Sequence, residues 1–321
     1  MDQYIIELTE EETEILNDLA GQIMISPSDR PEEFCEMVRT LTKQIPSRIR
    51  EHLLDFAKHG SESGYLLFRK IAVPSVESPP DNSRKMGEKT QLARVQALLI
   101  SVIGQMIAYE AEGYGRLFQD VVPMRALAQN QTSVGSNVEL EIHTEQAFSR
   151  LRPDILSLAC IRGDPNALTY ILPVKYILEH MSRDEIELLR EPLWKTGVDL
   201  SFKLHGQEFA EGDIRGPMPI IYGSEEDPLL TFDQDLMFSE HEIGEHLLKK
   251  IVALYYEKRG QHNLTSGEII LIDNNRAVHG RSPFSPKYDG QDRFLIRCFA
   301  TFDYEKSSHA RVGRTVSAIY S

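Results

Sequence analysis

The sequence predicts an α+β fold in which a jelly-roll core, or double-stranded β-helix, carries helices on its outside. First, apolar residues recur mainly at helical spacing in residues 1–110. Second, residues 111–321 contain short β-rich runs broken by Gly, Pro, Asn and Asp. Third, a helical insertion at about 174–256 interrupts these runs, which then resume. Helices first and a divided set of strands afterwards favour one elaborated domain over residues 1–321.

Four helices are predicted in the N-terminal part of the chain. Thr9 and Glu12 match a capping box and predict a helix through about residue 20. Pro31 predicts the start of a second helix, and a third amphipathic stretch ends near Lys58. The fourth helix is predicted by helical spacing of Leu92, Val95, Leu99, Val102, Ile103 and Met106. Residues 64–68 between the last two helices are typical of a buried strand.

The remaining elements alternate between strands and the helical insertion. Strands are predicted at 116–122, 138–143, 155–160, 169–172, 268–273 and 293–302. Helices are predicted at about 174–180, 183–189 and 240–256. The Gly-containing stretch 204–219 is predicted to be a mobile surface loop.

Charge and cysteine content exclude several functional classes. A formal net charge of -14 argues against a nucleic-acid or anionic-membrane surface, and it suits a small cationic substrate. The three cysteines are far apart, so they predict neither a disulfide framework nor a thiolate metal site. The chain starts without a basic region and has no run of 18 apolar residues, so we expect a cytoplasmic protein.

A candidate metal centre is formed by His143, Glu145 and His279. His143 and Glu145 are two residues apart on a predicted strand, which would direct both side chains to one face. His279 follows the predicted strand 268–273. Two imidazoles and one carboxylate are the facial triad of non-haem Fe(II) sites. The alternative is that His143 and Glu145 form an ordinary solvated salt bridge.

Arg293 is a candidate for binding an acidic co-substrate. It follows His279 by 14 residues and lies on the next predicted strand. When a 2-oxo acid chelates iron through its keto-carboxylate end, its second carboxylate needs an anchor. The planar guanidinium matches a carboxylate bidentately. The alternative is a surface arginine that pairs with Asp289 or Asp292.

These features resemble the Fe(II)/2-oxoglutarate dioxygenases, specifically the clavaminate synthase-like (TauD-related) group that hydroxylates free amino acids. The resemblance covers most of the chain from about residue 60, and its most specific part lies between His279 and Arg293. The matching stretches are Gly60 to Leu67, Glu141-Ile142-His143-Thr144-Glu145, Leu158-Ala159-Cys160, Tyr222-Gly223, Asp227-Pro228 and Asp273 to Arg297.

The resemblance implies a role for each matched residue near the metal. His143, Glu145 and His279 would be the iron ligands and Arg293 the 2-oxoglutarate clamp. Thr169 falls where the family places a threonine on the co-substrate carboxylate, although this match requires a gap after residue 162.

The resemblance also implies how a free amino acid would be held. Arg297 would bind the α-carboxylate, because a second buried guanidinium needs a second carboxylate. Gln119 and Ser133 would contact the amino-acid head group; alternatively they are ordinary polar loop residues. Asp233 and Asp235 would face one pocket if their segment is extended, and two such carboxylates need a cation between them. The alternative for this pair is a solvated acidic loop.

The leading hypothesis is therefore an oxidoreductase that uses Fe(II), 2-oxoglutarate and O2 to hydroxylate an unactivated C–H bond. The predicted substrate is a free basic L-amino acid, lysine or arginine, and the co-products are succinate and CO2. In one alternative, the protein catalyses the same reaction on a β-lactam precursor, an asparagine-like molecule or a sulfonate. The other is a non-catalytic jelly roll that binds a small molecule.

Overall fold

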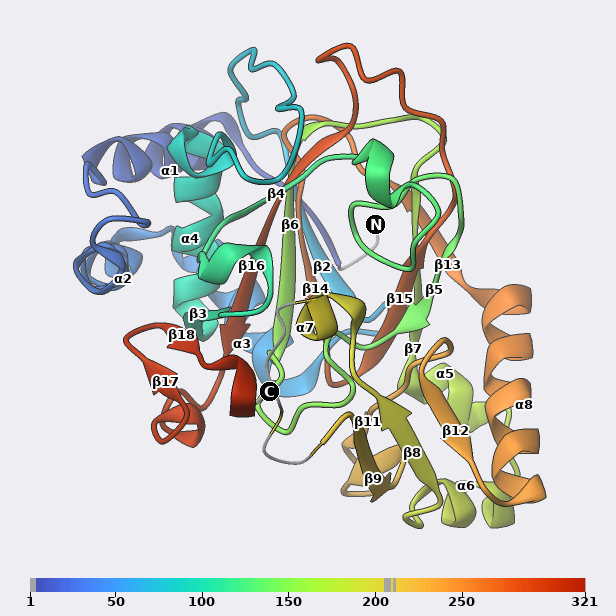
Figure 1. The fold of residues 1–321 in the computed structure, drawn as a ribbon. Helices are drawn as coiled ribbons and strands as arrows, with labels where there is room; N and C mark the ends of the chain where they lie inside the picture. Colours follow the sequence, from blue (N-terminus) through green and yellow to red (C-terminus); the bar gives the residue numbers. More distant parts are fainter. Residues whose placement is uncertain (1–3, 205–208, 210–211, 321) are drawn as a thin grey trace.

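Two β-sheets face each other at the centre of the computed structural model, which describes residues 4–204, 209 and 212–320 (Figure 1). Within these residues the larger sheet has nine strands, and β4 (Gln119–Val121) pairs with β16 outside the main path. The main path is β1 (Ile5–Glu7), β2 (Tyr65–Arg69), β14 (Ile269–Asp273), β6 (Ile155–Arg162), β16 (Phe294–Thr301), β3 (Gln105–Tyr109), β18 (Thr315–Val316) and β17 (Arg311–Val312). The smaller sheet runs β13 (Gly260–Asn263), β7 (Leu168–Pro173), β15 (Ala277–Arg281) and β5 (Leu140–His143).

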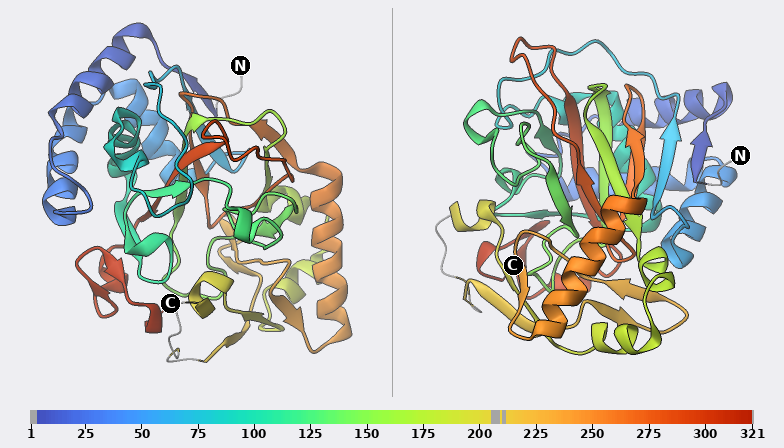
Figure 2. Two further views of the ribbon diagram at one scale, coloured as in Figure 1. Left: turned by 45° about the horizontal axis from the view of Figure 1, so that its top comes forward. Right: turned by 90° about the vertical axis from the view of Figure 1, so that its right-hand side faces the viewer.

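Helices cover the outer face of each sheet. On the larger sheet, α4 (Gln91–Ile103) lies against the strands, and α1 (Glu10–Gln22), α2 (Pro31–Leu41) and α3 (Ser47–His59) pack around it. The smaller sheet is covered by α5 (Val174–Glu179), α6 (Arg183–Leu189) and α8 (Glu242–Lys258). Figure 2 places α8 on the opposite side of the sheets from α1 and α2.

Short elements complete the region that the sequence marked as an insertion. Two small sheets are present, one of β12 (Met237–Ser239), β8 (Trp194–Gly197) and β9 (Ile214–Met218), the other of β10 (Ile221–Gly223) and β11 (Pro228–Leu230). Helix α7 (Leu200–Leu204) follows β8. The chain therefore mixes helices and sheets as predicted.

Strand alternation assigns each side chain of the central sheets to one layer. In β16, Ile296 packs with the helices on the outer face, whereas Leu295 and Phe299 pack between the sheets. In the smaller sheet, Ile142 and Val278 pack outward against α8 and its neighbours. Because successive strand residues face opposite sides, residues 143, 279 and 297 face the space between the sheets. Strands buried on both faces also explain the near-continuous apolar runs in the sequence.

Most predicted elements are present with small shifts in their ends. The capping box at the start of α1 is confirmed: Thr9 accepts a bond from the Glu12 N–H, and the Glu12 carboxylate accepts one from the Thr9 N–H. The fourth predicted helix is too long, because α4 ends at Ile103 and Met106 lies in β3. At the break, Gly104 is so close to β16 that a Cβ would lie 2.9 Å from the Thr301 carbonyl oxygen.

The prediction of a loop at 204–219 is wrong in part. Residues 214–218 form β9, which pairs with β8 and buries Arg215. Residues 205–208 and 210–211 of this stretch lie outside the described residues. Across the described chain, every helix is too short or too polar to cross a membrane.

Candidate active site

The pairing of β5 with β15 brings His143 and His279 together. His143 is the last residue of β5, and it stands directly opposite His279 in the antiparallel register. Both side chains face the space between the sheets, and their ring centroids are 4.5 Å apart. The pairing of two strands therefore brings together two histidines that are 136 positions apart in the sequence.

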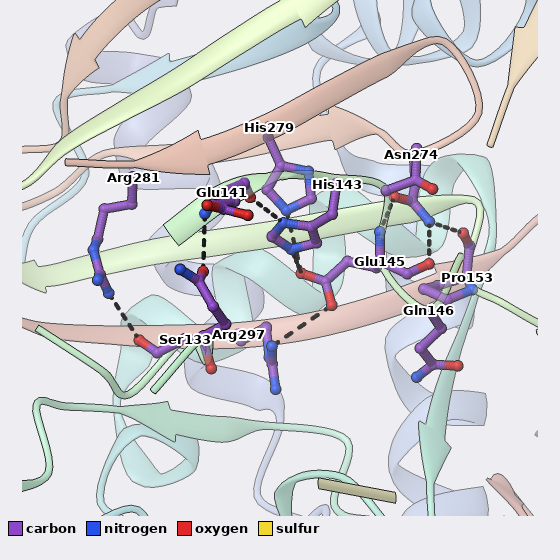
Figure 3. A network of polar contacts seen from close by, with 12 residues as sticks. Ser133, Glu141, His143, Glu145, Gln146, Pro153, Asn274, His279, Arg281 and Arg297 are labelled. Carbon is purple, nitrogen blue, oxygen red and sulfur yellow. Dashed lines mark hydrogen bonds and ion pairs between the residues drawn. The ribbon is translucent and has the colours of Figure 1, made fainter. Parts of the chain in front are cut away.

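Glu145 reaches the histidines from a turn rather than from a strand. Strand β5 ends at His143, so the predicted strand alternation does not orient Glu145. Its backbone is instead held by the buried side chain of Asn274, which accepts a bond from the Glu145 N–H at 2.7 Å. The Glu145 Oε1 atom lies 3.2 Å from His279 Nε2 and 3.8 Å from His143 Nε2 (Figure 3).

The three side chains can hold one metal ion. One ligand atom from each of His143, Glu145 and His279 lies within 4.8 Å of the others. The Nδ1 atom of His143 is 2.8 Å from the carbonyl oxygen of Glu141. A carbonyl can only accept, so Nδ1 carries a hydrogen, and Nε2 is the nitrogen that would bind a metal ion once it is deprotonated. This donor set is that of a facial triad, and His143 and Glu145 line a cavity.

Protonation in this cluster is strongly coupled. Burial disfavours the imidazolium, but the hydrogen bond and charge of Glu145 outweigh it and raise the pKa of His143 to about 9. Burial alone would raise the pKa of Glu145, but hydrogen bonds from both histidines hold it well below its usual value. Burial and the charge of His143 lower the pKa of His279. A cation bound to Glu145 would take the place of the proton that this carboxylate favours on His143.

Arg297 lies beside this cluster within a network of buried polar groups. Its Nη2 is 2.5 Å from Glu112 Oε1, and its Nη1 is 3.7 Å from Glu145 Oε2. Its Nε and Nη2 also donate to Gln119 Oε1 at 2.9 and 2.6 Å. The Gln119 Nε2 atom is buried and makes no hydrogen bond within the described residues. Arg297 and Gln119, predicted separately, are thus direct partners.

Arg293 and Thr169 are buried, and their polar side-chain atoms form no hydrogen bond with any residue that the structure describes. Arg293 is 5% exposed, and no described residue forms a hydrogen bond or ion pair with its guanidinium. Burial lowers its pKa to about 10, and its charge adds to burial in lowering the pKa of Arg281 to about 9. Arg281 stands opposite Thr169 in the sheet, and the Thr169 hydroxyl also lacks a partner among the described residues.

A cavity of about 460 Å³ opens from the metal cluster toward solvent. Six acidic side chains line it, against the basic side chains of His143, Lys203 and Arg297. The six are Glu112, Glu141, Glu145, Asp199, Asp233 and Asp235. Ser133 also lines the cavity, whereas Gln119, Thr169, His279 and Arg293 do not. The cavity is therefore suited to a positively charged molecule.

Asp233 and Asp235 share this cavity but not one extended segment: Asp233 forms an isolated antiparallel bridge with His143, and Asp235 lies in the turn that follows. Asp233 is 6% exposed and accepts a bond from the Leu236 N–H at 2.7 Å. Burial raises its pKa to about 6, against the opposing charge of His143. Asp235 is exposed. In the described part of the chain neither carboxylate has a salt-bridge partner.

Sequence reasoning missed Glu112 and Asp199. Glu112 forms the ion pair with Arg297, and burial raises its pKa. Asp199 lines the cavity just before α7, and burial, followed by the charge of Asp233, raises its pKa well above the usual value. The only local signal is an acidic residue between small or apolar neighbours, Ala111 and Gly113 or Val198 and Leu200. That signal is too common to single out either residue.

Comparison with known proteins shows matches over nearly the whole chain. Residues 44–299 match the family "Taurine catabolism dioxygenase TauD, TfdA family". The chain is 45% identical to an L-lysine 3-hydroxylase of Catenulispora acidiphila, over 99% of this chain and 90% of that protein. It is 30% identical to an L-asparagine oxygenase of Streptomyces coelicolor, over 96% and 93% of the two chains.

A similar solved structure is that of asparagine oxygenase in complex with Fe(II), 2S,3S-3-hydroxyasparagine and succinate. It superposes with a TM-score of 0.89 at 28% sequence identity, covering 98% of this chain and 99% of the other.

Proposed function

The chain belongs to the TauD/TfdA family of dioxygenases, and on that premise we propose that it hydroxylates an unactivated C–H bond of a free basic L-amino acid, with L-lysine as the first candidate. The predicted family is confirmed, as is an oxidoreductase that uses Fe(II), 2-oxoglutarate and O2. The observation that carries the choice of substrate is the group of cavity carboxylates Asp199, Asp233 and Asp235, which form no salt bridge within the described residues and lie in the same cavity as a site able to bind metal. The similarity to an L-lysine 3-hydroxylase supports it.

In this proposal His143, Glu145 and His279 are the iron ligands. The donor set fits ferrous iron, because two neutral imidazoles and one carboxylate bind it while leaving positions open. Fe(II) bound there, with 2-oxoglutarate and O2, supplies the oxidising power for hydroxylation and yields succinate and CO2. The contact between His143 Nδ1 and the Glu141 carbonyl orients the imidazole toward the ion.

Arg293 and Thr169 would hold the distal carboxylate of 2-oxoglutarate. A buried guanidinium and a buried hydroxyl without partners are costly unless a ligand completes their hydrogen bonds. A carboxylate satisfies both, and it compensates the charge that burial makes unfavourable on Arg293. The neighbouring Arg281 cannot serve as the clamp, because its donors are used by the carbonyl oxygens of Ser133, Gly135 and Val138.

Arg297 would receive the α-carboxylate of the amino acid, and the free Gln119 Nε2–H lies beside it to donate a second bond. Elsewhere on the cavity wall, Asp199, Asp233 and Asp235 would attract the side-chain cation. Ser133 would contact the head group from the cavity wall. A zwitterionic head at the metal and a cation at the carboxylates would place the intervening methylene groups near iron.

The two facing sheets are proposed to form a jelly-roll core, and residues 1–321 to form one domain. We also propose a cytoplasmic location, which is supported by three buried cysteines that form no disulfide.

A screen of free amino acids tests the function. Purified protein would be incubated with Fe(II), 2-oxoglutarate and each of the twenty amino acids, ornithine and citrulline, while succinate and oxidised product are measured by mass spectrometry. We expect succinate release to be stimulated most by L-lysine, with a product 16 mass units heavier. Stimulation by L-asparagine with none by lysine, ornithine or arginine would contradict the proposal.

A further inference from the structure

We propose that Asn274 is a positioning residue that holds Glu145 in place as a metal ligand, an inference that rests on the proposed function. Asn274 itself touches neither the cavity nor the two imidazoles. Its side chain acts on the backbone of Glu145 (Figure 3).

The three ligands are fixed in different ways. His143 and His279 lie on paired strands, so the hydrogen-bond register of β5 and β15 sets their separation. Glu145 lies two residues beyond the end of β5, and the next residue, Gln146, has a positive φ of 53°. The sheet therefore does not determine where the carboxylate points. A third ligand with a free backbone would widen the site and weaken metal binding.

Asn274 supplies the missing constraint through three hydrogen bonds. Its Oδ1 accepts from the Glu145 N–H at 2.7 Å, and its Nδ2 donates to the Glu145 carbonyl oxygen at 3.2 Å. The same Nδ2 donates to the Pro153 carbonyl oxygen at 2.7 Å. Only a side-chain amide offers an acceptor and two donors at this length. Asn274 is 0% exposed, so water cannot replace these bonds.

The position of Asn274 in the chain joins Glu145 to His279. Asn274 is the first residue after β14, in the turn that leads into β15 and its histidine. Its own N–H donates to the Asp154 carbonyl oxygen at 2.9 Å, which fixes the turn to the start of β6. One side chain thus ties the segment carrying Glu145 to the turn that leads into the strand carrying His279.

The neighbouring Asn275 provides a matched control. Its Nδ2 donates to Asp154 Oδ1 at 2.7 Å, and its Oδ1 accepts from the Tyr222 hydroxyl at 3.1 Å. Asn275 therefore stabilises the same turn with a side chain of the same type, but it makes no contact with a ligand residue. Its loss should weaken the fold without moving Glu145.

The experiment measures Mn(II) binding to the full-length metal-free protein by calorimetry, together with the melting temperature of each variant. N274A should weaken Mn(II) binding by about 10- to 100-fold, as expected when a metal ligand loses its hydrogen-bond partner. N275A should lower the melting temperature and keep the wild-type Kd. If N274A does not fold, the isosteric N274D takes its place, because it lacks both donors and should also bind Mn(II) more weakly.

H279A separates failure of this inference from failure of the proposed function. Wild-type protein that binds no Mn(II), or an H279A variant that binds it equally well, would refute the metal site itself. If wild type binds at this site but N274A has an unchanged Kd, only the role of Asn274 is refuted. Equal weakening in N274A and N275A would also refute it, because it would indicate general loosening of the turn.

Discussion

The two ends of the active-site cavity are built from different kinds of structure. At the metal end, His143, His279 and Arg297 lie on strands of the two central sheets. At the acidic end, Asp199 lies between β8 and α7, and Asp233 lies between β11 and β12, where it forms an isolated antiparallel bridge with His143. The metal end is therefore fixed by strand register, while the acidic end depends on connecting segments.

The two regions should therefore control different properties of the enzyme. Changing a residue on a central strand disturbs a layer that is packed on both faces. Changing a connecting segment alters charge in the cavity with little effect on the sheets. We therefore expect variants at the metal end to affect the reaction as a whole, and variants at the acidic end to affect which amino acid binds.

The largest effect is expected for His279→Ala. Loss of a direct ligand should weaken Mn(II) binding by more than about 100-fold, since loss of a ligand's hydrogen-bond partner alone weakens metal binding by about 10- to 100-fold. It should also abolish succinate formation. Calorimetry and a coupled succinate assay measure the two results. Retained metal affinity would mean that the sheet register does not build the metal site.

Arg293→Met should affect the co-substrate more than the amino acid. Losing the charged anchor should raise the KM for 2-oxoglutarate by about 30-fold or more, with a much smaller change in the KM for lysine. The ligand-free variant should melt about 2 °C higher, because an uncompensated buried charge has been removed. Steady-state kinetics and calorimetric melting test both effects. An unchanged KM for 2-oxoglutarate would exclude Arg293 as the clamp.

Asp233→Asn should alter the acidic end without altering the metal end. We expect the KM for lysine to rise about 10-fold, because the variant removes a buried charge that binds the side-chain ammonium group of lysine. The Kd for Mn(II) should stay within about twofold of wild type, since the amide keeps the backbone contacts of this turn. A KM for lysine equal to that of wild type would show that Asp233 does not bind the side-chain ammonium group of lysine.

Asp235→Asn should have the smallest effect, about twofold or less on the KM for lysine. Asp235 lines the same cavity as Asp233, but it is exposed and solvent screens its charge. The two variants change charge equally, so their difference measures the contribution of burial. An Asp235 variant as impaired as the Asp233 variant would argue against that explanation.

The sequence predicted the N-terminal helices well because their signals are local. The Thr9 capping box and Pro31 mark helix starts through contacts within one turn of the chain. The end of α4 was predicted too late, since the apolar periodicity continues through Gly104 and only the packing of Gly104 against β16 reveals the break. Strand β15 was missed because it is short and contains two ionisable side chains, His279 and Arg281.

Part of the candidate site could be predicted from the sequence, and part could be identified only from the structure. The sequence brought His143, Glu145 and His279 into one hypothesis, and the structure places them together. It could not indicate that Glu145 leaves the strand, because Asn274, which holds it, is 129 residues away. The sequence could not identify Glu112 or Asp199 as site residues either. Glu112 is recognised by its ion pair with Arg297 and Asp199 by its place in the cavity wall, and neither belongs to a sequence motif.

The most direct test of the central claim is anomalous diffraction at the iron edge from crystals prepared anaerobically with Fe(II). We expect a single strong peak between the two sheets, bonded to Nε2 of His143, Nε2 of His279 and a carboxylate oxygen of Glu145. A peak at another location, or iron bound without all three of these side chains, would contradict the proposed metal centre.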